Sequence, residues 1–254
     1  MDKASRRFTW LYAKSQLKLK YRYTALGFLW NLLEPGLFLG VLSFVFSVVN
    51  RMRISDYAVF LFSALVPWRY FEKVVTTSMD SIVQGDWLMK KLPVSPFALP
   101  LTRWIVASAE FGFSFAVVFL IFAILKTHWT IHCLILPLSA VPWSLLGLGL
   151  GLVFAALFTF FRDIRPVVQI GLMLAFFTAP ILFKPDLFTA HTIQRSMIVW
   201  HPVTYLAALF QKPLYDGAWP SALDWSVSFG VAAVSLLAGV LLVKRSRAQF
   251  YFYL

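Results

Sequence analysis

Charged side chains within long apolar stretches are the residues of this sequence whose chemistry most needs an explanation. Glu34, which precedes Pro35, lies in one such stretch, Arg69 and Glu72 lie in a second, and Glu110 lies in a third. An ionised group at mid-bilayer costs about 2.5–3.5 kcal/mol on insertion scales, so in a membrane each would need a partner or polar surroundings. The spacing of Arg69 and Glu72 predicts an ion pair within one helix. Glu110 is a candidate partner for a basic residue. Glu34 has two alternatives: its side chain faces a polar conduit, or it reaches the cytoplasmic boundary, where it snorkels or forms an ion pair.

No arrangement typical of an enzyme accompanies these charges. The four histidines show no metal-ligand spacing, and neither HExxH nor GxSxG occurs. Cys133 is the single cysteine, which excludes an intrachain disulfide and a four-cysteine zinc site. Gly147, Gly149 and Gly151 lack the Lys-Ser/Thr of a phosphate-binding loop, and the spacing of Gly147 and Gly151 predicts close helix packing instead. We expect no catalytic residues, no metal and no cofactor bound by this chain.

Composition indicates the class of protein. Of the 254 residues, 60% are hydrophobic and 13% are charged, and the mean hydropathy is +0.75. An ordinary soluble domain is about 45–50% apolar and about 25% charged, so a soluble enzyme and a disordered chain are both excluded. The net charge of +12 then indicates basic residues on the cytoplasmic flank of a membrane rather than a surface that binds nucleic acid. The fold class predicted is an all-α integral membrane protein.

Six stretches are long and apolar enough to cross a bilayer. A helix needs about 20 mostly apolar residues to span about 30 Å of hydrocarbon. The predicted transmembrane helices occupy 27–49, 57–75, 97–125, 132–160, 164–183 and 225–243. Most lysines and arginines lie in alternate connections and in the two terminal segments, which places both termini in the cytoplasm. The chain thus divides into an N-terminal segment, 1–26, a six-span domain, 27–243, and a cytoplasmic tail, 244–254.

The N-terminal segment, 1–26, has its apolar and its basic residues on separate stripes at helical spacing. This pattern predicts an amphipathic helix that lies in the membrane interface. Lys18, Lys20 and Arg22 could meet the phosphates of an anionic lipid-linked substrate. The alternative is that the segment serves only topology and anchoring.

Two cytoplasmic connections carry further candidate residues. A short helix is predicted at about 78–91, and its end forms either a docking knob for a cytoplasmic partner or a solvated loop. The residues of that end are Asp86, Trp87, Leu88, Met89, Lys90 and Lys91. In the turn between the fourth and fifth spans, Asp163 is expected to hold Arg162 or Arg165 and so to fix the turn.

The longest non-cytoplasmic stretch is 184–224, and it is not an ordinary polar loop. Its two apolar segments, 193–200 and 202–210, are each too short to cross a bilayer. They predict short re-entrant helices, which are tolerated at membrane depth only where protein or a watery cavity covers them. We expect this stretch to line an exit on the periplasmic side.

Aromatic residues inside the predicted spans are the feature of this sequence that indicates a function. The chain has 26 Phe, 10 Trp and 9 Tyr. Aromatic residues commonly gather at the two membrane–water interfaces, which explains many of these rings but not those inside the spans. Aromatic faces stack on the apolar faces of sugar rings, so a path lined by them would let a glycan slide. The candidates for such a path are Trp30, Phe38, Phe176 and Phe177, together with Glu34. Packing against lipid or protein is the alternative for any single ring.

Motifs along nearly the whole chain, in order, resemble permeases of type-2 ABC transporters that export polysaccharides. The motifs lie at 20–35, 66–71, 88–91, 160–163, 180–183, 201–205 and 216–217. They resemble the entry to the first span, the second span with its coupling helix, the junction of the fourth and fifth spans, and the segment before the last span. His201 stands where the family usually has asparagine. Within the family the resemblance is greatest to O-antigen exporters, with capsule and teichoic-acid exporters next.

The resemblance implies a homodimeric permease that pairs with two copies of a separate ATPase subunit, on which ATP and Mg²⁺ bind. It implies a polysaccharide linked to undecaprenyl diphosphate as substrate, and a channel mainly between the first and fifth spans of the two subunits. It also implies a multi-pass protein of the bacterial inner membrane, with 78–91 as its coupling helix.

Two other classes of function stay open on the sequence. An exporter of the same fold for a drug or a small lipid would need no continuous aromatic-lined channel. An intramembrane enzyme, such as a polyprenyl-sugar transferase, would need carboxylates or histidines clustered at one depth, and the sequence shows no such cluster.

Overall fold

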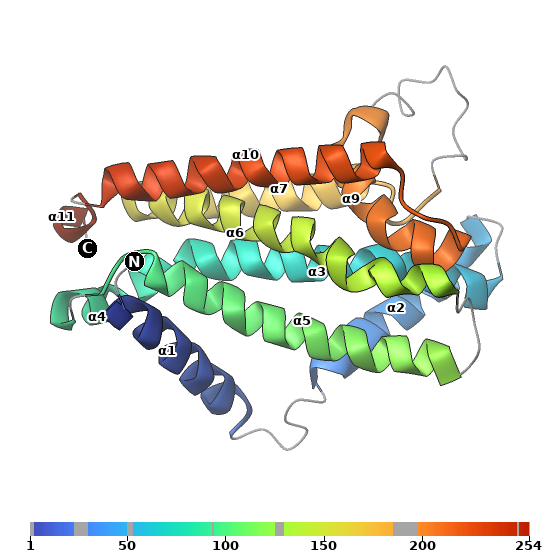
Figure 1. Cartoon of the computed structure of the whole chain (residues 1–254), viewed down its shortest axis with the longest axis horizontal. Helices are drawn as coiled ribbons and strands as arrows, with labels where there is room; N and C mark the ends of the chain where they lie inside the picture. The colour runs from blue at the N-terminus through green and yellow to red at the C-terminus, as the bar shows by residue number, and fades with distance from the viewer. Residues whose placement is uncertain are drawn as a thin grey trace.

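The computed structural model of the chain is a bundle of helices (Figure 1). It describes residues 3–22, 30–49, 53–92, 94–124, 130–184, 198–247 and 249–253. Within these ranges every regular element is a helix, which confirms the all-α prediction.

Each predicted span coincides with a helix. These helices are α2 (Trp30–Val49), α3 (Ile54–Gln84), α5 (Ala98–Ile124), α6 (Leu136–Phe160), α7 (Ile164–Thr178) and α10 (Ala222–Ser246). The other elements are α1 (Lys3–Tyr21), α4 (Asp86–Lys91), η2 (Ile131–Ile135), α9 (Pro202–Gln211), η4 (Lys212–Asp216) and α11 (Phe250–Tyr253).

Length and hydropathy single out two of the described helical stretches as able to cross a bilayer, Ile131–Phe160 and Ala222–Ser246. Gly36–Val48 and Ile164–Thr178 are shorter apolar helices. That the chain crosses the membrane six times therefore stays a prediction.

Helix α6 lies between α3 and α10 and packs against both (Figure 1). A Cβ atom added to Gly149 would lie 2.5 Å from the backbone nitrogen of Leu236, and one added to Gly239 would lie 2.5 Å from the carbonyl oxygen of Gly149. Real Cβ atoms are not found so close to other backbones, so the contact between α6 and α10 requires glycine on both helices.

The other side of α6 approaches α3 through Gly147 and Gly151. A Cβ atom at Gly147 would lie 3.2 Å from the Cβ of Val74, and one at Gly151 would lie 2.7 Å from the Cβ of Ser78. The predicted packing role of Gly147 and Gly151 is confirmed.

Buried aromatic side chains fill the space between these helices. Trp68 and Phe71 of α3 and Trp143 of α6 are buried, with ring centroids 5.4–6.4 Å apart. Buried indole N–H groups normally have a hydrogen-bond acceptor. Nε1 of Trp143 donates to the carbonyl oxygen of Leu206 at 3.0 Å, which attaches α9 to the bundle.

Helix α9 forms where the sequence predicts one short re-entrant helix, at 202–210. Its apolar side chains, among them Leu206 and Phe210, are buried, and α9 packs against α3, α6 and α10. This cover by protein is what short helices at membrane depth require. Of the other predicted segment, 193–200, residues 193–197 lie outside the described ranges.

His201 caps α9, which explains how histidine can replace asparagine at this position. Nδ1 of His201 accepts a hydrogen bond from the amide of Val203 at 3.2 Å, and Pro202 occupies the first helical position. An asparagine oxygen accepts the same kind of bond. Burial lowers the pKa of His201, which favours the neutral ring that can act as acceptor.

We expect Gly149→Ala to destabilise the protein, because the new methyl group would collide with the backbone of α10. Overpacking of this kind costs about 1–3 kcal/mol, whereas alanine in an open helical position gains up to about 1 kcal/mol over glycine. Thermal unfolding of the detergent-solubilised chain, followed by circular dichroism, measures the change.

Gly230→Ala on α10 is the matched control, because nothing lies within 4 Å of a Cβ at that position. If Gly149→Ala and Gly230→Ala unfold at the same temperature, the close approach of α6 and α10 is wrong.

Candidate functional site

Helix α4 lies at the end of the molecule that also carries both described chain ends (Figure 1). Leu88 and Met89 are buried in a cluster with the end of α3 and the start of α5. The opposite face is open: Trp87 is 56% exposed, and Nζ of Lys90 pairs with Oδ1 of Asp86 at 2.9 Å one turn away. Lys91 is exposed as well. Helix α4 thus has one anchored face and one face available to a partner.

The helix predicted at about 78–91 is divided in the structure. Residues up to Gln84 continue α3, where Met79 and Ile82 are buried, and α4 begins only at Asp86. The break falls at Gly85, whose added Cβ atom would lie 2.5 Å from a methyl group of Leu99 on α5. A larger residue at position 85 would require the Leu99 side chain to move where the chain turns from α3 into α4.

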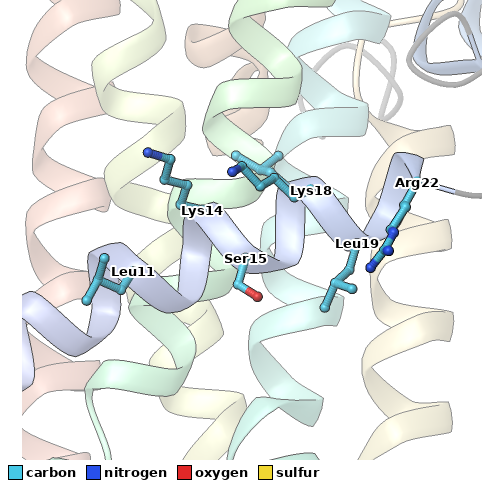
Figure 2. A pocket seen from close by; sticks show the side chains of 7 residues that line it. Leu11, Lys14, Ser15, Lys18, Leu19 and Arg22 are labelled. Atoms are coloured by element: carbon cyan, nitrogen blue, oxygen red, sulfur yellow. The ribbon is translucent and has the colours of Figure 1, made fainter.

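An open groove runs along α1, and its basic side chains come from successive turns. Figure 2 shows Lys14 and Lys18 on one side of the helix and Ser15, Leu19 and Arg22 on the other, with Leu11 before Lys14. Lys18, Lys20 and Arg22 are the candidates for contact with the phosphates of a lipid-linked substrate, with anchoring alone as the alternative. The structure separates them, because Lys20 points to α5 instead.

Glu110 joins three helices through two ion pairs. Its Oε1 lies 2.6 Å from Nζ of Lys20 on α1, and its Oε2 lies 2.5 Å from Nζ of Lys73 on α3. The Glu110 side chain is 3% exposed, whereas the lysines are 44% and 39% exposed. Burial lowers the pKa of Lys20, the hydrogen bond to Glu110 opposes this, and the charge of Lys73 adds to the lowering. The expectation that Glu110 pairs with a basic residue is confirmed.

A cavity of about 830 Å³ lies beside this junction, between α2, α3 and α5. Arg69 and Glu72 line it and form the predicted ion pair, with Nη1 of Arg69 3.1 Å from Oε2 of Glu72. Cζ of Arg69 lies 4.5 Å from the ring centroid of Phe38 on α2, which is a cation–π distance. The predicted Arg69–Glu72 pair is confirmed.

The predicted glycan-path residues occupy different surroundings. Phe38 lies in the cavity with Arg69, and Phe176 packs 5.7 Å from the ring of the buried Trp68. Phe177 is 57% exposed on α7, with its ring 5.3 Å from that of Phe176. Trp30 and Glu34 lie on α2, but their side chains are outside the described part of the chain.

The turn before α7 is held differently from the prediction. Asp163 was expected to pair with Arg162 or Arg165, but Nη2 of Arg165 lies 2.6 Å from Oδ1 of Asp80 on α3. Arg162 and Arg165 both lie over the ring of Phe158, at 5.2 and 5.1 Å. The turn is thus attached to α3 by a pair 85 residues apart in sequence.

The sequence did not identify the two members of those ion pairs that join helices far apart in the chain. Lys20 and Glu110 are 90 residues apart, and Arg165 and Asp80 are 85 apart, so no local spacing marks either pair. The available signal was the cost of an uncompensated Glu110 in an apolar stretch, which requires a partner without naming it. Within the described ranges no group of three His, Cys, Asp or Glu side chains could hold a metal ion.

Comparison with known proteins finds relatives over most of the chain. The chain is 30% identical over 177 residues to the O-antigen export system permease protein RfbA of Klebsiella pneumoniae, with 67% of this chain and 66% of the relative covered. It is 27% identical to the RfbA protein of Myxococcus xanthus, with coverage of 92% and 90%. It is 24% identical to the polysialic acid transport protein KpsM of Escherichia coli, with coverage of 90% and 89%. No family model matches the chain.

The relatives are named as permeases of an O-antigen export system and as a polysialic acid transport protein. The chain belongs to the polysaccharide-exporter family of ABC transporter permeases. It spans slightly less than two thirds of the Klebsiella relative and nearly all of the Myxococcus relative.

We expect Glu110→Gln to loosen the attachment of α1, because two ammonium groups would then face each other without the carboxylate between them. Removing one member of a buried ion pair costs about 3–5 kcal/mol. Both lysines are partly exposed, so a loss of about 1–3 kcal/mol is expected here. Faster hydrogen exchange at the end of α1, in detergent or nanodiscs, is the measurement.

Glu72→Gln is the matched control. Its pair with Arg69 is within one helix and partly exposed, and such pairs contribute about 0.5 kcal/mol or less. Unchanged exchange in α1 after Glu110→Gln would contradict the role of the junction.

Proposed function

We propose that this chain is the membrane-spanning permease subunit of an ATP-driven exporter that moves undecaprenyl-diphosphate-linked polysaccharide of the O-antigen type. The observation that carries the proposal is similarity over 92% of the chain to an O-antigen export permease. Six spans and both termini in the cytoplasm of a bacterial inner membrane complete it. The helix positions and the distribution of lysine and arginine support this topology.

Helix α4 is the surface that we assign to a separate ATPase subunit. Its buried residues, Leu88 and Met89, connect it to α3 and α5, while Trp87 is available for contact. Exposed aromatic residues next to charged ones are typical of interface anchors. Two ATPase copies would then serve two permease subunits.

One face of α7 supports a second copy of the chain as partner. Val167, Ile170, Met173, Leu174 and Phe177 are each more than half exposed. In a membrane such a row contacts either lipid or another protein, and we assign it to a second copy of the chain. In the proposed homodimer this face lies at the channel between the first and fifth spans, where Phe176 and Phe177 would border the glycan.

The basic groove of α1 supports an anionic lipid carrier for the glycan. Lys14, Lys18 and Arg22 follow one another along the helix (Figure 2). Cations on an interface helix attract lipid phosphates, so this groove is the proposed first contact of the diphosphate.

The alternatives differ in cargo or in class. A capsular polysaccharide is favoured as second candidate by the similarity to KpsM, and a teichoic acid, a drug or a small lipid would be other cargoes of the same fold. An intramembrane glycan-transfer enzyme is the less favoured alternative, because the relatives are named as export and transport proteins.

Deletion of the gene in its own host tests the proposal. Lipid-linked glycan should accumulate at the cytoplasmic face and surface glycan should be lost, and both should be restored by the intact gene. Lectin staining of cells and extraction of the lipid-linked glycan measure the two effects. Undiminished surface glycan after deletion would refute the function.

We expect the double substitution Lys90→Glu with Lys91→Glu to weaken pairing with the ATPase subunit at least about tenfold, a loss of about 1.4 kcal/mol. Reversal of two charges on the exposed face of α4 opposes the proposed contact and also removes the Lys90–Asp86 pair. Co-purification of the tagged permease with its ATPase measures the effect.

Lys244→Glu with Arg245→Glu changes the charge equally on the exposed end of α10 and is the matched control. If both double variants retain the ATPase to the same extent, α4 is not the docking surface.

A further inference from the structure

The cavity between α2, α3 and α5 is a second place where a ligand can bind, distinct from the α1 groove and from α4. Its volume of about 830 Å³ falls within the range of small-molecule sites, roughly 300–1,000 Å³. Most of its lining is apolar, and its charged groups come from α3 and α5. Glu110, one of these groups, also pairs with Lys20 of α1, so the cavity lies at the level of the proposed interface helix.

The charges that line this cavity cancel. Arg69 and Lys73 are the cations among its described lining residues, and Glu72 and Glu110 are the carboxylates. Each cation pairs with one carboxylate, Arg69 with Glu72 at 3.1 Å and Lys73 with Glu110 at 2.5 Å. A ligand with a net charge would leave that charge uncompensated in mostly apolar surroundings. The cavity therefore favours a headgroup without net charge.

The two ion pairs do not use all the donors and acceptors of their members. A guanidinium carries five N–H donors, and the pair with Glu72 uses one donor of Arg69, at Nη1. A carboxylate accepts at both oxygens, and the same pair uses Oε2 of Glu72. Arg69, Glu72 and Lys73 all line the cavity from one face of α3, at positions i, i+3 and i+4. A small headgroup that carries both an anion and a cation would therefore find a partner for each.

An apolar stripe leads from the cavity along α2. Leu37 and Val41 line the cavity and are 66% and 64% exposed. Phe44 and Val48 continue the stripe at helical spacing and are 71% and 78% exposed. From residue 37 to residue 48 the stripe extends about 16 Å along the helix, which is close to the length of a lipid acyl chain. A lipid would therefore fit better than a water-soluble zwitterion.

We propose that this cavity binds the headgroup of a zwitterionic phospholipid, such as phosphatidylethanolamine, with one acyl chain along the stripe on α2. Arg69 and Lys73 donate to the phosphate oxygens, and the ammonium group donates to the carboxylate of Glu72. The short ethanolamine link lets the two ends of the headgroup reach neighbouring side chains of α3. The bound lipid joins α2 to α3. The inference rests on the proposed placement of the chain in a membrane.

The same charge balance separates this lipid from other occupants. The headgroup of phosphatidylglycerol would add one negative charge beside Glu72 and Glu110. The diphosphate diester of the proposed substrate would add two. A diacylglycerol offers no charged group to Arg69, Lys73 or Glu72.

Titration of the delipidated full chain in detergent, followed by native mass spectrometry, tests the proposal. The probes are dioctanoyl phosphatidylethanolamine, dioctanoyl phosphatidylglycerol, dioctanoylglycerol and undecaprenyl diphosphate. We expect phosphatidylethanolamine to bind at least about fivefold more tightly than each of the others, because it alone forms hydrogen bonds to groups of both charges. This comparison needs no variant, so it holds even where a substitution impairs folding.

A change in the charge of the lining should change which lipid is preferred. Glu72→Gln leaves one cation of the cavity without a carboxylate, so phosphatidylglycerol should then bind more tightly than phosphatidylethanolamine. Asp80→Asn is the matched control, because it removes the same charge from α3 at a residue that pairs with Arg165 and does not line the cavity. It should leave the preference for phosphatidylethanolamine unchanged.

Four results would each overturn the proposal. They are equal binding of phosphatidylethanolamine and phosphatidylglycerol, tighter binding of dioctanoylglycerol or undecaprenyl diphosphate, the same order of lipids before and after Glu72→Gln, and equal shifts in Glu72→Gln and Asp80→Asn. Surface glycan after gene deletion is a separate readout, so failure of the lipid site and failure of the export function are distinguishable.

Discussion

Helix α6 can lie between α3 and α10 because glycine removes the side chain at each point of closest approach. Gly149 and Gly239 bring two backbones together on one side, and Gly147 and Gly151 admit Val74 and the Ser78 methylene on the other. Helices that are apolar all round cannot be sorted by polarity, so van der Waals contact between close backbones has to fix their order. The positions of α5 and α9, which pack against α3 and α6, follow from this contact.

The positions of the helices could be read from the sequence because hydropathy and helix breakers act locally. Each predicted span coincides with a helix, and 202–210 is helical as its flanking His201-Pro202 indicates. The division at Gly85 was missed, since glycine is destabilising but tolerated within a helix. Leu99 on α5 approaches the chain at Gly85, and this tertiary contact has no local signal in the sequence.

The candidate site was predictable only where its parts are close in sequence. Arg69 and Glu72 share a helix and pair as their spacing indicates. The junction at Glu110 unites α1, α3 and α5, and the pair of Arg165 with Asp80 unites α7 and α3. Such pairs depend on how helices far apart in the chain are arranged, so residue types alone predict that Glu110 needs a partner but not which one.

Helix α3 connects the surfaces on which the proposed function depends. It continues through Gly85 into α4, it carries Lys73 of the α1 junction, and it carries Asp80, which holds the start of α7. At 31 residues it is about 46 Å long.

A force applied at α4 by an ATPase subunit would therefore reach both the interface helix and the exposed face of α7. Under the proposed function, the ion pairs on α3 would pass that movement to α5 and α7. They lie between Gly85 and Trp68, whose ring packs against Phe176, so one helix carries both the contact with the proposed glycan path and the turn into the proposed docking surface.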